Sequence, residues 1–185
     1  MSREGYIPLN IVKKIPRLEQ ILPVYAVIVV MIYTWSLILF FWRLPSWINF
    51  STLGEIAVIF SYMVVVNLVE SILVLLLLAA LSMILPPKWF HDRFVTKGSS
   101  LVLLGLGCLM YFNNNLLDDI LFPLLMLKKI LIVVAAILAL VFLIDRISLL
   151  NRFLEELANR MIVFLYIWLP ISALSLLTVL VRNIF

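Results

Sequence analysis

The sequence predicts an all-α integral membrane protein with about five transmembrane helices. Of its 185 residues, 65% are hydrophobic and 13% are charged, whereas soluble domains have about 45–50% apolar and about 25% charged residues. Apolar runs long enough to cross a bilayer recur along the chain, and most of the charges lie in the short connections between them. Since backbone polar groups must be hydrogen-bonded inside hydrocarbon, we expect these runs to be helices.

The chain divides into an arm over residues 1–20 and a single helical transmembrane domain over residues 21–185. The arm combines basic side chains with prolines, which predicts a segment lying on the cytoplasmic headgroups. The amphipathic stretch 151–160 is expected either as a short surface helix or as an extension of a neighbouring span. The five expected spans are residues 21–42, 53–85, 99–117, 130–149 and 161–181.

The distribution of basic residues predicts the topology. With the N-terminus inside, ten Lys and Arg residues fall on the cytoplasmic side and four fall outside. This bias predicts a cytoplasmic N-terminus and an outer C-terminus. We expect the membrane to be the cytoplasmic membrane of a bacterium or archaeon. A span gained or lost within residues 113–129 would move the C-terminus to the other side. Because the basic residues follow this pattern, we expect no nucleic-acid partner.

Polar side chains within the second span are the main functional candidates. Burying a carboxylate at mid-membrane costs roughly 2.5–3.5 kcal/mol on insertion scales, so Glu70 needs a reason to be there. Asn67 precedes it by about one helical turn. At about 100° per residue, Glu55, Tyr62, Asn67 and Glu70 share a sector of roughly 140°. We expect this stripe to face protein or water, with Glu70, Asn67 and Tyr62 forming a polar contact or an ion or proton site.

Local signals predict structure at two further places. Thr52 and Glu55 have the spacing of a capping box, which gives Glu55 a structural role at the start of the second span. Gly105 and Gly107 predict that another helix approaches the third span closely.

A second polar group follows the third span. Its amide and carboxylate oxygens suit a divalent cation, but they suit a helix-capping turn as well, and we favour the turn and expect no metal. The apolar residues 120–127 are too few to cross a bilayer and are expected to be re-entrant, interfacial or part of a span. Near the next connection, Asp145 and Arg146 are expected to form an interfacial pair. The members of the outer polar group are Asn113, Asn114, Asn115, Asp118 and Asp119.

No catalytic pattern accompanies these residues. The sequence has no cluster of His or Cys ligands, GxSxG elbow, HExxH helix or P-loop, so we expect no enzyme. It requires no cofactor, although bound lipid is expected and a pigment or quinone stays open. The favoured function is a non-catalytic subunit that packs with other membrane subunits or with itself. The alternative is a small oligomeric channel, or a proton- or cation-coupled transporter, that uses Glu70.

Overall fold

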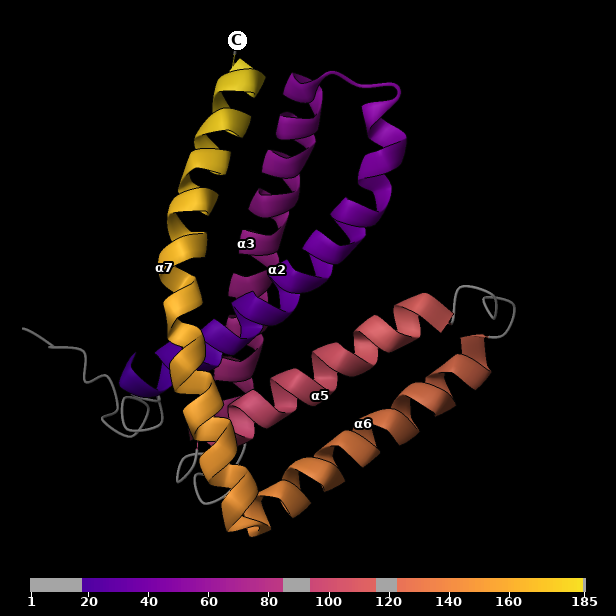
Figure 1. Ribbon diagram of the computed structural model, residues 1–185. Helices are drawn as coiled ribbons and strands as arrows, with labels where there is room; N and C mark the ends of the chain where they lie inside the picture. Colours follow the sequence, from indigo (N-terminus) through magenta and orange to yellow (C-terminus); the bar gives the residue numbers. More distant parts are fainter. Residues whose placement is uncertain (1–17, 85–93, 116–122, 185) are drawn as a thin grey trace, which may run out of the picture.

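The described part of the chain is entirely helical. A computed structural model describes residues 18–84, 94–115 and 123–184, without the side chains of residues 113–115, 123–127 and 129 (Figure 1). Most of the predicted arm lies outside these ranges. The five described helices are α2 (Leu18–Ile48), α3 (Leu53–Ile84), α5 (Phe94–Asn115), α6 (Pro123–Arg146) and α7 (Ser148–Ile184).

Four of the described helices are long and apolar enough to cross a membrane. They are α2, α3, residues 94–112 of α5, and α7. Mean hydropathy is highest in α3, at 2.7 over its most apolar window. This architecture is compatible with an all-α membrane protein.

Helix extents agree best with the prediction for α3, which ends one residue before the expected boundary. α2 and α7 run beyond their predicted spans at both ends, whereas α5 and α6 begin before the predicted starts and are described to Asn115 and Arg146, short of the predicted ends. α2 continues through Pro23 and Pro45 to Ile48, because neighbouring groups can satisfy the backbone that a proline frees in an apolar helix. α7 begins at Ser148, so the amphipathic stretch 151–160 is the first part of one long helix rather than a separate surface helix.

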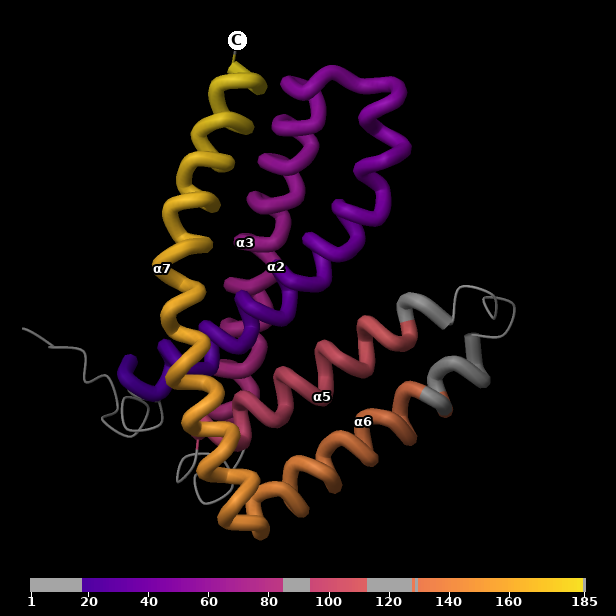
Figure 2. The backbone as a smooth tube through the Cα atoms, in the orientation of Figure 1, coloured from indigo at the N-terminus to yellow at the C-terminus, as the bar shows by residue number. Residues whose placement is uncertain are grey.

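The helices form a three-helix bundle and a hairpin. α2, α3 and α7 stand together, with α3 antiparallel to the other two, while α5 and α6 run antiparallel and lean away from them (Figure 1). α2 curves along its length (Figure 2) and packs against α3, α5 and α7. α2 therefore joins the hairpin to the bundle, together with α7, which contacts both α5 and α6.

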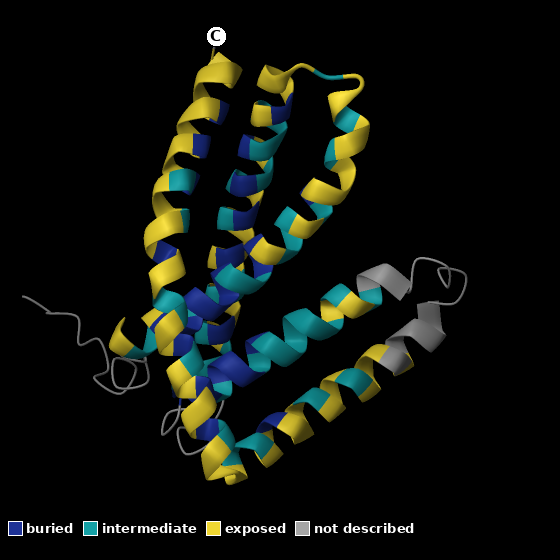
Figure 3. Cartoon of the chain, in the orientation of Figure 1, coloured by how far each residue is buried: buried dark blue, intermediate teal, exposed yellow. Residues whose placement is uncertain are grey.

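The core lies around the first half of α2. Val24 and Ile28 are completely buried, and Tyr33 is 2% exposed. Gly98 of α5 lies against Val24, where an added Cβ would be 3.3 Å from both Val24 methyl carbons. Figure 3 shows the buried residues concentrated where α2 meets α5 and α7. The close helix approach in α5 is thus at Gly98.

The predicted close approach at Gly105 and Gly107 is not observed. A Cβ built at either glycine meets nothing within 4 Å among the described residues. α5 diverges from the bundle toward these positions (Figure 1). The two glycines therefore lie on the part of the hairpin that leans away.

Small hydroxyl side chains line the buried helix contacts. The hydroxyl groups of Tyr33 and Ser172 are 2.8 Å apart, which links α2 to α7. Ser172 also donates to the carbonyl of Trp168, and the rings of Tyr33 and Trp168 lie 4.6 Å apart. Such small residues allow close helix approach, and bonding to their own helix satisfies their hydroxyls within apolar surroundings.

α6 is the most exposed helix of the described fold. Val141 is the one buried residue among its described side chains (Figure 3). Apolar residues such as Ile132 and Leu131 are more than 60% exposed. Its main contacts among the described helices are with α5 and α7. Surface of this kind suits lipid or another apolar helix.

Candidate functional site around Glu70 and Asn67

The capping box at the start of α3 is confirmed. The backbone N–H of Thr52 donates to Glu55 Oε2 at 2.8 Å, and the backbone N–H of Glu55 donates to Thr52 Oγ1 at 3.3 Å. These reciprocal bonds satisfy amide groups that a helix start leaves unpaired. Glu55 therefore has a structural role, which leaves Asn67 and Glu70 as the polar groups within the apolar length of α3.

Glu70 is exposed near the middle of α3. It lies about 25 Å from the start of the helix and about 21 Å from its end, at 1.5 Å per residue. Among the described residues, its carboxylate has no hydrogen-bond or ion-pair partner. It lines an open groove of about 260 Å³ between α2, α3 and α5. The surroundings of this carboxylate are mainly apolar, with Leu73 and Val74 on α3 and Leu109 and Met110 on α5.

Asn67 lies one turn before Glu70 but faces the interior. It is 3% exposed, and its Oδ1 accepts a hydrogen bond of 2.8 Å from Ser36 Oγ on α2. Ser36 also lines the groove at Glu70. The Asn67 Nδ2 atom is buried without a hydrogen-bond partner in the described part of the chain. Asn67 thus ties α2 to α3, while its Nδ2 group has no hydrogen-bond partner among the described residues.

Tyr62 lies apart from these two residues. Its hydroxyl donates to Asn183 Oδ1 at 3.0 Å, which joins α3 to the last turn of α7. Tyr62 precedes Glu70 by about 12 Å along the helix axis. The structure therefore separates the three residues: Glu70 lines the groove, Asn67 lies in the contact between α2 and α3, and Tyr62 contacts the end of α7.

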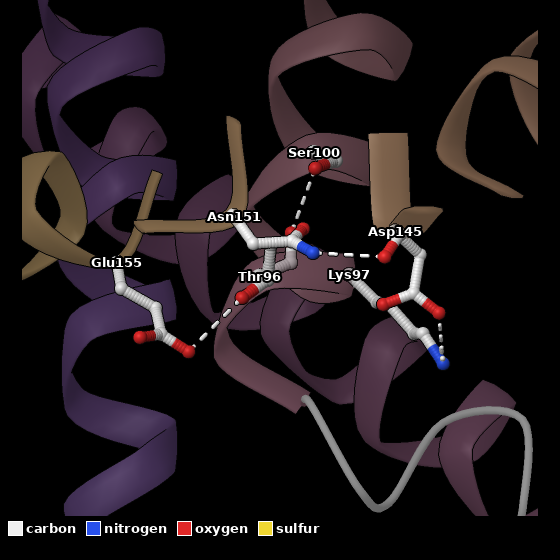
Figure 4. A network of polar contacts seen from close by, with 6 residues as sticks. All are labelled: Thr96, Lys97, Ser100, Asp145, Asn151 and Glu155. Atoms are coloured by element: carbon white, nitrogen blue, oxygen red, sulfur yellow. Dashed lines mark hydrogen bonds and ion pairs between the residues drawn. The ribbon is translucent and has the colours of Figure 1, made fainter. Parts of the chain in front are cut away.

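A second polar cluster joins α5, α6 and α7 (Figure 4). We call it the junction cluster, and its members are Thr96, Lys97, Ser100, Asp145, Asn151 and Glu155. Lys97 Nζ lies 3.1 Å from Asp145 Oδ2, and Asn151 Nδ2 donates to the Asp145 carbonyl at 2.8 Å. Thr96 Oγ1 donates to Glu155 Oε1 at 3.2 Å. These contacts link α5 to α6, α6 to α7, and α5 to α7.

The expected pairing of Asp145 with Arg146 is wrong. Asp145 pairs with Lys97, whereas the Arg146 guanidinium lies over the Phe142 ring at 5.3 Å. Lys97 precedes the predicted third span, which begins at residue 99, but it lies in the first turn of α5. One sequence signal could have predicted the pair of Lys97 and Asp145. These opposite charges lie at the inner ends of the third and fourth predicted spans, which follow each other in the chain.

The outer polar group predicted after the third span lies outside the described side chains. Asn113, Asn114 and Asn115 end α5, while Asp118 and Asp119 fall in the undescribed residues 116–122. Its two interpretations, a cation site and a capping turn, both stay predictions. Among the described residues, no three His, Cys, Asp or Glu side chains are grouped so that they could hold a metal ion.

Comparisons with known proteins add no relative. No protein-family model, no curated protein and no solved structure matches this chain.

Proposed function

We propose that this protein is a non-catalytic polytopic membrane subunit that packs through the Glu70 face of α3 against other membrane subunits or against itself. The observation that carries this proposal is the Glu70 carboxylate, which is exposed in an apolar groove without a partner among the described residues. A carboxylate facing hydrocarbon is costly, and intramembrane charges face protein or water in nearly all cases. A protein contact from outside the chain removes that cost.

The topology that goes with this proposal has a cytoplasmic N-terminus, five crossings and an outer C-terminus. It is supported by the bias of basic residues toward one side. The start of α2 and the end of α7 also lie at opposite ends of the bundle (Figure 1). The hairpin of α5 and α6 begins and ends at the same end of the bundle, which preserves this arrangement.

Native mass spectrometry after mild-detergent extraction from the source membrane tests the assembly proposal. The expected result is a reproducible particle in which this chain is accompanied by different polypeptides or by a fixed number of its own copies. A clean monomer, obtained under conditions that preserve known complexes of the same membrane, would contradict it.

Proton or cation coupling by Glu70 is the second candidate function. The observation that favours it is that Glu70 and Ser36 place two polar side chains in one open groove, with Ser36 hydrogen-bonded to the buried Asn67. Flux into liposomes tests this candidate, with Glu70→Gln as the variant and exposed Ile72 replaced by Leu as the control. Ion- or proton-dependent flux that Glu70→Gln abolishes and Ile72→Leu retains would support coupling over assembly.

A further inference from the structure

The groove at Glu70 has the chemistry of a cation site. A carboxylate favours a cation within about 4–6 Å, and Trp35 lines the same groove with an aromatic ring, the side-chain type that binds cations best through its face. The remaining lining is apolar apart from Ser36. Carboxylate and indole together favour an ammonium or guanidinium group over a neutral or anionic one.

The size of the groove indicates a side chain rather than a cofactor. Its volume is about 260 Å³, below the roughly 300–1,000 Å³ of typical small-molecule sites. A whole helix is about 10–12 Å wide with its side chains and cannot enter it. A helix lying across the groove can, however, insert one long side chain toward Glu70.

The depth of Glu70 excludes lipid headgroups as the source of the cation. It lies more than about 20 Å from either end of α3, and the hydrocarbon core is about 30 Å thick in total. Headgroup amines therefore stay well away from a residue at mid-helix. The cation has to arrive on a chain that is itself inside the membrane.

A second copy of this chain is poorly equipped to supply the cation. Arg43, near the end of α2, is the sole Lys or Arg in the fully described helices α2 and α3. Lys97 is paired with Asp145, and Arg160 with Glu156 at 2.6 Å. The other basic residues of α6 and α7 lie within about two turns of a helix end, far from the mid-helix depth of Glu70: Lys128, Lys129, Arg146, Arg152 and Arg182. A helix from a different protein is under no such constraint.

We infer that the groove formed by Trp35, Ser36 and Glu70 receives a Lys or Arg side chain from a transmembrane helix of a different protein. This inference rests on the proposed assembly function and names the chemistry of the partner. Asn67 is not part of this docking surface, because it is 3% exposed and does not line the groove.

Site-specific photo-crosslinking in the source membrane tests this inference. The probe is p-benzoylphenylalanine at Leu73, which is 58% exposed and lines the groove. The control position is Ile72, which is 43% exposed and lies outside the groove lining. The expected result is one adduct, specific to Leu73, with a different membrane protein. Its crosslinked peptide should come from an apolar stretch that contains Lys or Arg.

Glu70→Gln, combined with the probe at Leu73, should lower the adduct yield about tenfold, because losing an ion pair that contributes about 1.4 kcal/mol of binding free energy weakens binding tenfold. Replacing the partner's basic residue by Gln should lower it equally. Since Glu70 has no hydrogen-bond or ion-pair partner among the described residues, the variant should fold, and an unchanged helical circular-dichroism spectrum of the purified chain will show it. Glu70→Asp, which keeps the charge, should retain most of the yield and serves if Glu70→Gln does not fold.

The alternative outcomes separate the inference from the assembly proposal. An adduct to a protein without a basic residue in the crosslinked apolar stretch, or a yield that Glu70→Gln leaves unchanged, overturns the inference alone. An adduct to a second copy of this chain overturns the inference but supports self-assembly. The absence of any polypeptide adduct at Leu73 contradicts both.

Discussion

Ser36 Oγ donates a hydrogen bond of 2.8 Å to Asn67 Oδ1 and so joins α2 to α3 beside the groove at Glu70. Asn67 is 3% exposed, and its other polar atom, Nδ2, has no partner among the described residues. Burying the Nδ2 group without a partner costs free energy, and the single hydrogen bond at Oδ1 offsets that cost only in part. The Asn67 side chain is thus held in place by one bond from a neighbouring helix.

Ser36→Ala should destabilise the protein more than Asn67→Leu. The first change leaves both ends of a buried amide unpaired and should cost about 1 kcal/mol of unfolding free energy. The second removes the unsatisfied amide itself and leaves the Ser36 hydroxyl able to bond its own helix. Unfolding by SDS titration in bicelles measures both, and the double variant gives the coupling energy. A larger loss with Asn67→Leu would contradict this account.

Gly98→Ala should destabilise the contact between α5 and α2. The new Cβ would lie 3.3 Å from both methyl carbons of Val24, a completely buried β-branched residue with little freedom to move. Overpacking of this kind costs about 1–3 kcal/mol.

Gly105→Ala is the matched control, because its Cβ meets nothing within 4 Å. Because alanine has a higher helix propensity than glycine, the free energy of unfolding of this variant should stay unchanged or rise by up to about 1 kcal/mol. The same SDS titration compares the two glycines. Equal effects of the two substitutions would show that α5 does not approach α2 at Gly98.

Reversing the charges of Lys97 and Asp145 should test whether their ion pair holds the hairpin together. Their side chains are 13% and 23% exposed, so the ion pair is neither fully exposed nor fully buried. Asp145→Lys or Lys97→Asp alone should therefore lower the free energy of unfolding by about 2 kcal/mol, between the values for exposed and buried pairs. The double reversal should recover much of that loss. The free energies of unfolding of the wild type, the two single variants and the double variant form a double-mutant cycle. If the loss in the double variant equals the sum of the two single losses, the two charges do not interact.

Thr52→Ala should weaken the start of α3 by about 1 kcal/mol, because it removes the acceptor for the Glu55 amide. Thr178→Ala is the control, since the Thr178 hydroxyl is exposed and bonds within its own helix, to the Leu174 carbonyl. Hydrogen exchange of the amides at residues 53–56 reports the local effect. Unchanged exchange at these amides in Thr52→Ala would show that the cap does not stabilise this helix end.

Local sequence signals predicted α3 well. Its length follows from an uninterrupted apolar run, and the spacing of Thr52 and Glu55 gives its first turn. The course of α2 through Pro23 and Pro45 was not predictable in the same way. Whether a proline ends an apolar helix depends on neighbouring groups that satisfy the freed backbone, and these come from the tertiary structure.

The candidate site was predictable in its chemistry but not in its geometry. A carboxylate and an amide in one apolar run are visible in the sequence. Their separation into an exposed Glu70 and a buried Asn67 depends on which side of α3 faces α2. Ser36 carries no signal of its own, because a serine in an apolar helix usually bonds within that helix.

The most direct test of the central claim compares native masses of wild-type protein, Glu70→Leu and Ile72→Leu, each extracted in mild detergent from the source membrane. Glu70→Leu removes the polar group that the assembly is proposed to satisfy, whereas Ile72→Leu alters an exposed apolar residue outside the groove. The account predicts the same assembled mass for wild type and Ile72→Leu, and loss of the partner chains from Glu70→Leu. An assembled mass that Glu70→Leu leaves intact, or a monomer in all three, would contradict it.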